Sequence, residues 1–150
     1  MARCFERSCK EGHVTGSAFL LSFDRKEILL TYHRKLKMWI QLGGHCDGES
    51  LVHEVALREA IEESGISELH LLSPIPFDID IHLIPANSKE EAHYHFDVRY
   101  IIIATTKDFI CSDESIELKW VPLDKVSHYS QEPSLLRAIK KIYNFVLRPR

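Results

Sequence analysis

Three glutamates in the middle of the chain have the residue type and spacing for metal chemistry. Glu59, Glu62 and Glu63 fall in the run 50–63, which contains no proline or glycine and is followed by Gly65. This composition predicts a helix with glycine at its C-terminal end. At 3.6 residues per turn, Glu59 and Glu63 lie one above the other, and Glu62 lies beside them. The three carboxylates therefore share one helix face.

The crowding of these acids favours a divalent cation over an ordinary solvated helix surface. Like charges four residues apart repel each other, and acids near a helix C-terminus oppose the helix dipole. A cation reverses both effects, and Mg²⁺ is commonly held by carboxylates, waters and substrate phosphates. Just upstream, the backbone of Gly43 and Gly44 can approach a ligand closely. On the opposite helix face, Leu57 and Ile61 are expected to pack on a sheet, leaving the acids toward a cleft or solvent.

These residues resemble the signature of the Nudix hydrolases. That pattern is Gly, five residues, Glu, seven residues, Arg-Glu, an aliphatic, any residue, Glu-Glu, any residue, Gly and an aliphatic. Its fixed positions agree in register between Gly44 and Ile66, apart from two departures. Ser50 stands where the first Glu belongs, with Glu49 one residue early, and Ala60 stands where a larger aliphatic is usual.

The resemblance implies roles for individual residues. In that family the helix acids bind Mg²⁺ or Mn²⁺, and the enzymes hydrolyse a nucleoside diphosphate linked to another moiety. By position, it implies metal ligands and catalytic groups at Glu59, Glu62 and Glu63, with Arg58 orienting them and the Gly43 carbonyl as a further ligand. An acid outside the signature often serves as base or extra ligand in the family. The sequence leaves the base open between Glu62, Glu63, Glu114 and Glu117, and Glu49 is a candidate additional acid in a supporting role.

A second group of ionisable residues follows two predicted strands. From Phe77 to Leu83 and from His93 to Tyr100, polar and apolar residues alternate with a period of two. An antiparallel hairpin would put the polar residues on one surface: Asp78, Asp80, His82, His93, His95, Asp97 and Arg99. A wetted sheet face explains each of them singly. Together they predict a substrate pocket beside the metal helix, with four binding residues: His93, His95, Asp97 and Arg99.

Two further interpretations involve histidines and basic residues. A transition-metal site at His93 and His95 stays open, but it needs further ligands, which the sequence does not identify. The basic segment 33–37 is interpreted as a solvated loop in preference to a phosphate contact.

The remaining patterns predict one domain, 1–150, with an α/β fold. The C-terminal segment 133–147 has apolar residues at helical spacing. Apolar or β-branched runs predict further strands at 14–22, 28–32, 38–42, 70–72 and 116–122. The result is a Nudix-like α/β/α sandwich, in which a mixed, partly antiparallel sheet lies between the signature helix and the C-terminal helix.

Composition limits the partners. With 19 basic and 22 acidic residues, a net charge of -3 and no long basic run, neither a nucleic-acid polymer nor a membrane is expected as the main partner. A small nucleotide is expected instead, bound by a monomer or homodimer. The N-terminal residues lack the apolar core of a signal peptide, so a cytoplasmic protein is expected. The four cysteines lack C-x-x-C spacing and are expected to be reduced thiols.

The leading function is that of a metal-dependent hydrolase of a pyrophosphate linkage, in a nucleoside triphosphate, ADP-ribose, a nucleotide sugar or a similar compound. A nucleotide-binding regulatory module of the same fold is second, although three crowded acids exceed what a binder needs. An isoprenoid-diphosphate isomerase is third. It would require a catalytic cysteine, for which Cys46 is the candidate by its position near Gly44.

Overall fold

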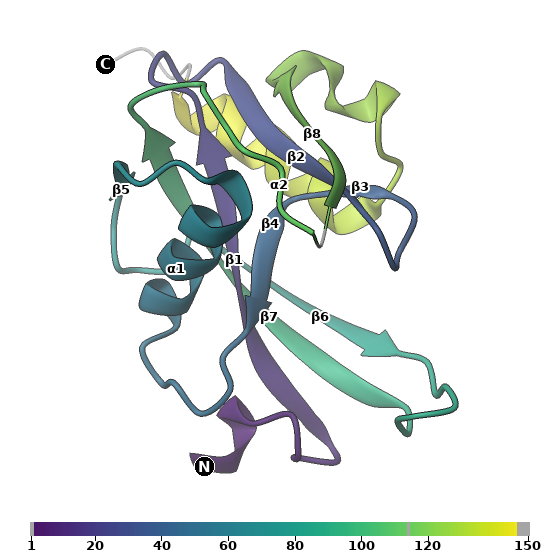
Figure 1. Cartoon of the computed structure of the whole chain (residues 1–150). Helices are drawn as coiled ribbons and strands as arrows, with labels where there is room; N and C mark the ends of the chain where they lie inside the picture. The colour runs from purple at the N-terminus through teal and green to yellow at the C-terminus, as the bar shows by residue number, and fades with distance from the viewer. Residues whose placement is uncertain (1, 114, 147–150) are drawn as a thin grey trace.

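One mixed sheet of eight strands lies between two helices in the computed structural model, which describes residues 2–113 and 115–146 (Figure 1). The predicted fold class is confirmed. The elements in chain order are η1 Ala2–Phe5, β1 Gly12–Leu21, β2 Glu27–His33, β3 Trp39–Ile40, β4 Leu42–His45, α1 Val52–Ser64, β5 Leu69–Leu71, β6 Asp78–Ile84, β7 His93–Ala104, β8 Ser115–Pro122, η2 Leu123–His128 and α2 Pro133–Val146.

Strand β1 is the centre of the sheet. It pairs with β7 in parallel and with β2 and β4 in antiparallel orientation. The predicted hairpin of β6 and β7 forms in antiparallel register, with Asp80 opposite Asp97. Strands β3 and β8 pair with β2, and β5 pairs with β7.

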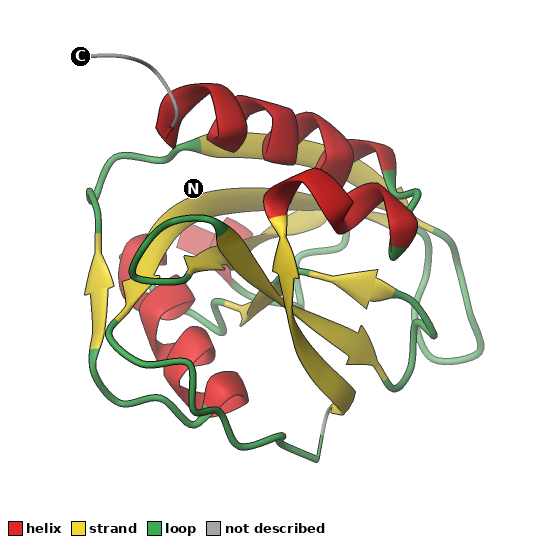
Figure 2. Cartoon of the chain, turned by 90° about the horizontal axis from the view of Figure 1, so that it is seen from above, coloured by secondary structure: helices red, strands yellow, loops and turns green. Residues whose placement is uncertain are grey.

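The sheet is covered on both faces in its central part. Along β1, Phe19 and Leu21 belong to the core that includes α2, whereas Ala18 and Leu20 belong to the core that includes α1. Successive side chains of a strand point to opposite faces, so the two helices lie on opposite sides of the sheet, as Figure 2 shows. Burial on both faces explains why the run 18–21 is apolar without alternation.

Helix α1 approaches the sheet through small residues. A side chain added at Gly16 would place its Cβ 3.0 Å from the carbonyl oxygen of Val52 and 3.2 Å from the nitrogen of Ala56. Ala56 and Ala60 are fully buried, whereas Leu57 and Ile61 contact the same core but are only partly buried. Leu57 and Ile61 thus pack on the sheet as expected, while the closest approach of α1 is made through the fully buried Ala56 and Ala60.

The β6–β7 hairpin is polar on its covered side. The apolar side chains of β6 are more than half exposed: Ile79, Ile81 and Leu83. The polar side chains of the same hairpin are buried or partly buried. Figure 1 shows the hairpin extending away from α1, so that helix leaves the apolar side open. A wetted polar face is therefore the wrong picture of these strands.

Within the described residues, neither helix is long and apolar enough to cross a membrane.

Candidate functional site

Helix α1 holds two of its acids against the glycine pair of β4. The backbone N–H of Gly43 donates a hydrogen bond to Oε2 of Glu63 at 3.1 Å. A Cβ on Gly44 would lie 2.5 Å from Cδ of Glu59, so only glycine leaves space for that carboxylate. The helix ends directly afterwards at Gly65, whose φ of 70° is left-handed and whose N–H bonds the carbonyl of Ile61.

The signature residues differ in exposure. Glu63 is buried, at 7 % exposed, although the acidic face was expected to point to a cleft or to solvent. Glu59 is partly buried, and Glu62 is exposed beside them. The exposed Arg58 lies with Nη2 3.7 Å from Oε1 of Glu59, where it can orient that carboxylate.

A pocket of about 440 Å³ opens next to Glu59. Its lining combines that acid and the backbone of Gly43 and Gly44 with cationic and polar side chains: Arg7, His33, Arg34, Lys35, His45 and Asp113. Arg7 is fixed by a bidentate pair with Asp47, at 2.8 and 2.9 Å, and this hydrogen bonding raises the pKa of Arg7. The pocket therefore places positive charge on the same lining as the Glu59 carboxylate.

The basic segment 33–37, interpreted from the sequence as a solvated loop, borders this pocket. It is the turn between β2 and β3, and three of its residues line the pocket. Arg34 and Lys35 are exposed, as expected, but they lie on the same pocket as Glu59. The pocket brings Arg34 and Lys35 together with Glu59, more than 20 positions away, so local composition could not reveal it.

The donor set of the acid site fits a hard cation. It comprises the carboxylates of Glu59, Glu62 and Glu63 beside the backbone of Gly43 and Gly44, and the Glu59 carboxylate fills the space over Gly44. Among the described residues, only one histidine group, on the other sheet face, brings three candidate ligand atoms within 4.8 Å of one another. Its members are His13, His93 and His95. The glutamates therefore suit an ion that retains several waters, as Mg²⁺ does.

The candidates for an additional acid lie in different places. Glu49 is exposed, and its Oε1 accepts a hydrogen bond from the N–H of Leu51, at 2.9 Å, just before α1. Glu117 is exposed on β8. Glu114 lies outside the described residues. The catalytic roles of all three stay predictions.

The polar face of the hairpin lies on the side of the sheet opposite the acids. The alternation of β7 puts His93, His95, Asp97 and Arg99 on the same face as Ile101 and Ile103, which pack in the core of α2. The sheet therefore lies between these side chains and α1, but His45, whose ring centroid is 5.4 Å from that of His95, connects them to the pocket at Glu59. That they bind substrate stays a prediction.

Arg99 is the most deeply buried member of this face, at 1 % exposed. Its Nε donates to Oδ2 of Asp97 at 2.9 Å, its Nη1 to Oδ2 of Asp78 at 3.3 Å, and its Nη2 to Oγ of Ser134 at 2.8 Å. Thr15 also donates to Asp97, at 2.8 Å. A guanidinium so enclosed ties the hairpin to the start of α2.

Five histidine rings, here called the histidine cluster, lie at the end of this face farther from α2: His13, His45, His82, His93 and His95. Ring centroids are 4.6 Å apart for His13 and His95, and 5.5 Å apart for His82 and His95. Burial lowers the pKa of His95 to about 3 and of His45 to about 4, and it also lowers the pKa of His13. His13 and His45 were not predicted as site residues, because neither belongs to a recognisable ligand motif in the sequence.

Cys46 is a poor nucleophile in this environment. Its side chain is 1 % exposed, and burial raises the pKa of its thiol to about 11. A catalytic cysteine requires the thiolate at neutral pH. The geometry thus gives no support to the isomerase alternative.

Comparison with known proteins identifies the family. The model of the NUDIX domain matches residues 13–142. A NUDIX-family hydrolase from Clostridium perfringens is 26 % identical, with a TM-score of 0.70 over 89 % of this chain and 97 % of that one. The E. coli dihydroneopterin triphosphate pyrophosphohydrolase is 15 % identical, with a TM-score of 0.69 over 87 % and 95 %. An Ap4A hydrolase from C. elegans is 18 % identical, with a TM-score of 0.64 over 89 % and 96 %.

No match was found among curated proteins. The chain belongs to the NUDIX family, and its enzyme class is that of the Nudix-type pyrophosphohydrolases.

Proposed function

We propose that this enzyme hydrolyses the pyrophosphate linkage of a nucleoside diphosphate joined to another moiety, with Mg²⁺ or Mn²⁺ at the signature acids. The observation that carries the proposal is the pocket that joins Glu59 and the glycine backbone of β4 to Arg7, Arg34 and Lys35. Carboxylates suit the cation, whereas arginine and lysine suit phosphate oxygens. A polyphosphate is the ligand that uses both.

The chain's own residues divide the task. Glu59 and Glu63 hold their carboxylates at Gly43 and Gly44, so the site is positioned before substrate arrives. When bound, the ion neutralises phosphate charge and lowers the pKa of a coordinated water. Water attacks one phosphorus, the bridging P–O bond breaks, and the water proton passes to an acid. The exposed Glu62 is accessible for that step, and Glu63 is the other signature candidate.

Arg34 and Lys35 are assigned to the part of the substrate that carries the remaining phosphate charge. Both side chains are exposed at the rim of the pocket and can reorient toward a ligand.

A substrate panel tests the proposal. Nucleoside triphosphates, dinucleoside polyphosphates, ADP-ribose, nucleotide sugars and coenzyme A would be incubated with the enzyme and Mg²⁺ or Mn²⁺, with EDTA as the control. Hydrolysis of at least one compound at the diphosphate, lost in EDTA, is the expected result. Tight binding of a nucleotide without turnover in either metal would instead identify a regulatory module.

A further inference from the structure

We propose that His13, His93 and His95 form a second metal site, for a transition-metal ion such as Zn²⁺, on the sheet face opposite the signature acids. Their candidate ligand atoms all lie within 4.8 Å of one another. The nitrogens around one tetrahedral zinc ion are about 3.4 Å apart, given bonds of about 2.0–2.1 Å. Side-chain rotations of modest size would therefore bring the three imidazoles onto one ion.

The register of the sheet assembles this group. Strands β1 and β7 are parallel and pair His13 directly with His95. His93 precedes His95 by two residues, so its side chain points to the same face. All three residues thus come from paired backbone, which fixes their relative positions better than loops would.

His13 provides the observation that points to a ligand. Its side chain is only 3 % exposed, and neither Nδ1 nor Nε2 has a hydrogen-bond partner. Buried polar side chains are bonded in the large majority of cases, and a neutral imidazole has one donor and one acceptor to satisfy. An ordinary core histidine would be expected to show at least one such bond. A metal ion would satisfy the free lone pair of His13.

His93 is already oriented as a metal ligand would be. Its Nδ1 lies 2.8 Å from the carbonyl oxygen of Glu91. A carbonyl can only accept, so Nδ1 carries the proton and Nε2 keeps its lone pair. Metal-binding histidines commonly donate their other N–H to a backbone carbonyl in this way.

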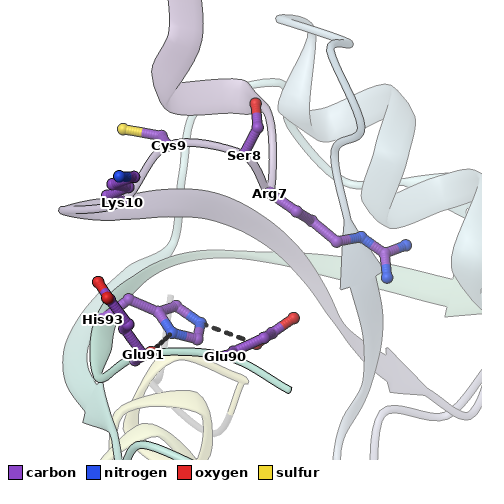
Figure 3. Close-up of a pocket in the computed structure, with 7 residues that line it drawn as sticks. All are labelled: Arg7, Ser8, Cys9, Lys10, Glu90, Glu91 and His93. Carbon is purple, nitrogen blue, oxygen red and sulfur yellow. Dashed lines mark hydrogen bonds and ion pairs between the residues drawn. The ribbon is translucent and has the colours of Figure 1, made fainter.

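Glu90 is a candidate for the fourth ligand. Figure 3 shows His93 linked to Glu90 and Glu91, which lie on the segment that leads into β7. Oε2 of Glu90 is 3.7 Å from Nε2 of His93, and the carboxylate is half exposed and therefore free to adjust. Three imidazoles and a carboxylate or water are a normal tetrahedral zinc environment.

The chemistry of this site differs from that of the acid site. Imidazole nitrogen suits zinc, nickel and copper, whereas carboxylate and carbonyl oxygen suit magnesium and manganese. His45 and His82 extend the nitrogen-rich surface, with ring centroids 5.1 Å from His13 and 5.5 Å from His95, respectively. A bound ion would crosslink the beginnings of β1 and β7, and thereby stabilise the hairpin.

Zinc retention by the protein without an affinity tag tests the proposal. The EDTA-stripped protein would receive excess Zn²⁺, pass through gel filtration, and be analysed for metal and protein. One zinc per chain is expected. His13→Gln and His93→Gln should each weaken zinc affinity at least tenfold in titration calorimetry, with the exposed His128→Gln as the matched control.

Two further measurements keep the test decisive. Glu63→Gln should retain zinc, because the Glu63 carboxylate lies on the other face of the sheet. Loss of zinc in this variant, together with retention in the histidine variants, would overturn the proposal. So would wild-type protein that retains none. If a histidine variant unfolds, the visible spectrum of wild-type protein with Co²⁺ decides, since a tetrahedral nitrogen site gives intense bands and octahedral oxygen ligation gives weak ones.

Discussion

The two faces of the sheet gather ionisable groups in contrasting ways. On the α1 face, acids from one short helical stretch meet the glycine pair of β4 beside an open, cationic pocket. On the α2 face, histidines from β1, β4, β6 and β7 share a largely buried surface with the Arg99 network. The first arrangement leaves room for water and substrate. In the second arrangement, protein contacts replace water. It therefore suits stabilisation of the fold or binding of an ion by nitrogen ligands.

Charged residues can gather on one surface because they bond to one another there. Asp97 accepts hydrogen bonds from Thr15 and Ser17, at 2.8 and 2.7 Å, and also pairs with Arg99. These bonds hold β1 and β7 together, and Arg99 also donates to Ser134 of α2. They account for Asp97 and Arg99 without a ligand, whereas the unpartnered His13 points to one.

The largest effect is expected from breaking the buried network. Arg99→Met should lower the free energy of unfolding by about 3–5 kcal/mol, because it leaves buried carboxylates without their cation. Arg137→Met is the matched control: it contacts the same Asp78, at 2.8 Å, but is half exposed. That change should cost less than about 1 kcal/mol. Urea unfolding measures both, and a raised KM with unchanged stability in Arg99→Met would return this residue to substrate binding.

A change at the acid site should affect turnover and leave the fold intact. Glu63→Gln keeps the volume and can still accept the hydrogen bond from Gly43, but it removes a metal-binding charge. We expect kcat/KM to fall at least about 100-fold, or about 2.7 kcal/mol. Glu54→Gln, an exposed acid in the first turn of α1, should change little. Near-native turnover of Glu63→Gln at saturating metal would refute the site.

Substitutions at two glycines should distinguish effects on turnover from effects on helix packing. Alanine at Gly44 would meet the flexible end of Glu59, whereas alanine at Gly16 would meet the backbone of α1. Gly44→Ala should therefore reduce kcat/KM about tenfold, or about 1.4 kcal/mol, with little change in Tm. Gly16→Ala should lower stability by about 1–3 kcal/mol, as overpacking does. Kinetics and thermal melts would be measured on both variants. A large drop in Tm for Gly44→Ala with unchanged kcat/KM would contradict the prediction.

The smallest expected effect is at the basic rim. Arg34→Ala and Lys35→Ala should each raise KM about fivefold, which is about 1 kcal/mol, with kcat nearly constant and a smaller difference at high salt. Lys125→Ala, on η2, is the control, because it lies outside the pocket lining. Identical kinetics for all three variants would restore the interpretation of segment 33–37 as a solvated loop.

Local features of this protein follow from the order of its residues alone. The absence of proline and glycine in 50–63, with Gly65 behind it, specified α1 and its C-terminal end, because helix propagation and capping depend on neighbouring residues. The period of two likewise specified β6 and β7. The spacing of Glu59, Glu62 and Glu63 placed the acids on one helix and carried the family resemblance.

Which sides of these elements are covered depends on how the elements pack together. Alternation defines two faces of a strand, but it does not say which one a helix buries, and the polar face of the hairpin is the covered one here. His13 meets His95 across 82 positions of chain, through parallel pairing of β1 and β7. Such contacts depend on how distant segments pack, which no local pattern records. For the same reason, the pocket that Arg34 shares with Glu59 and the burial of Arg99 depend on the assembled sheet.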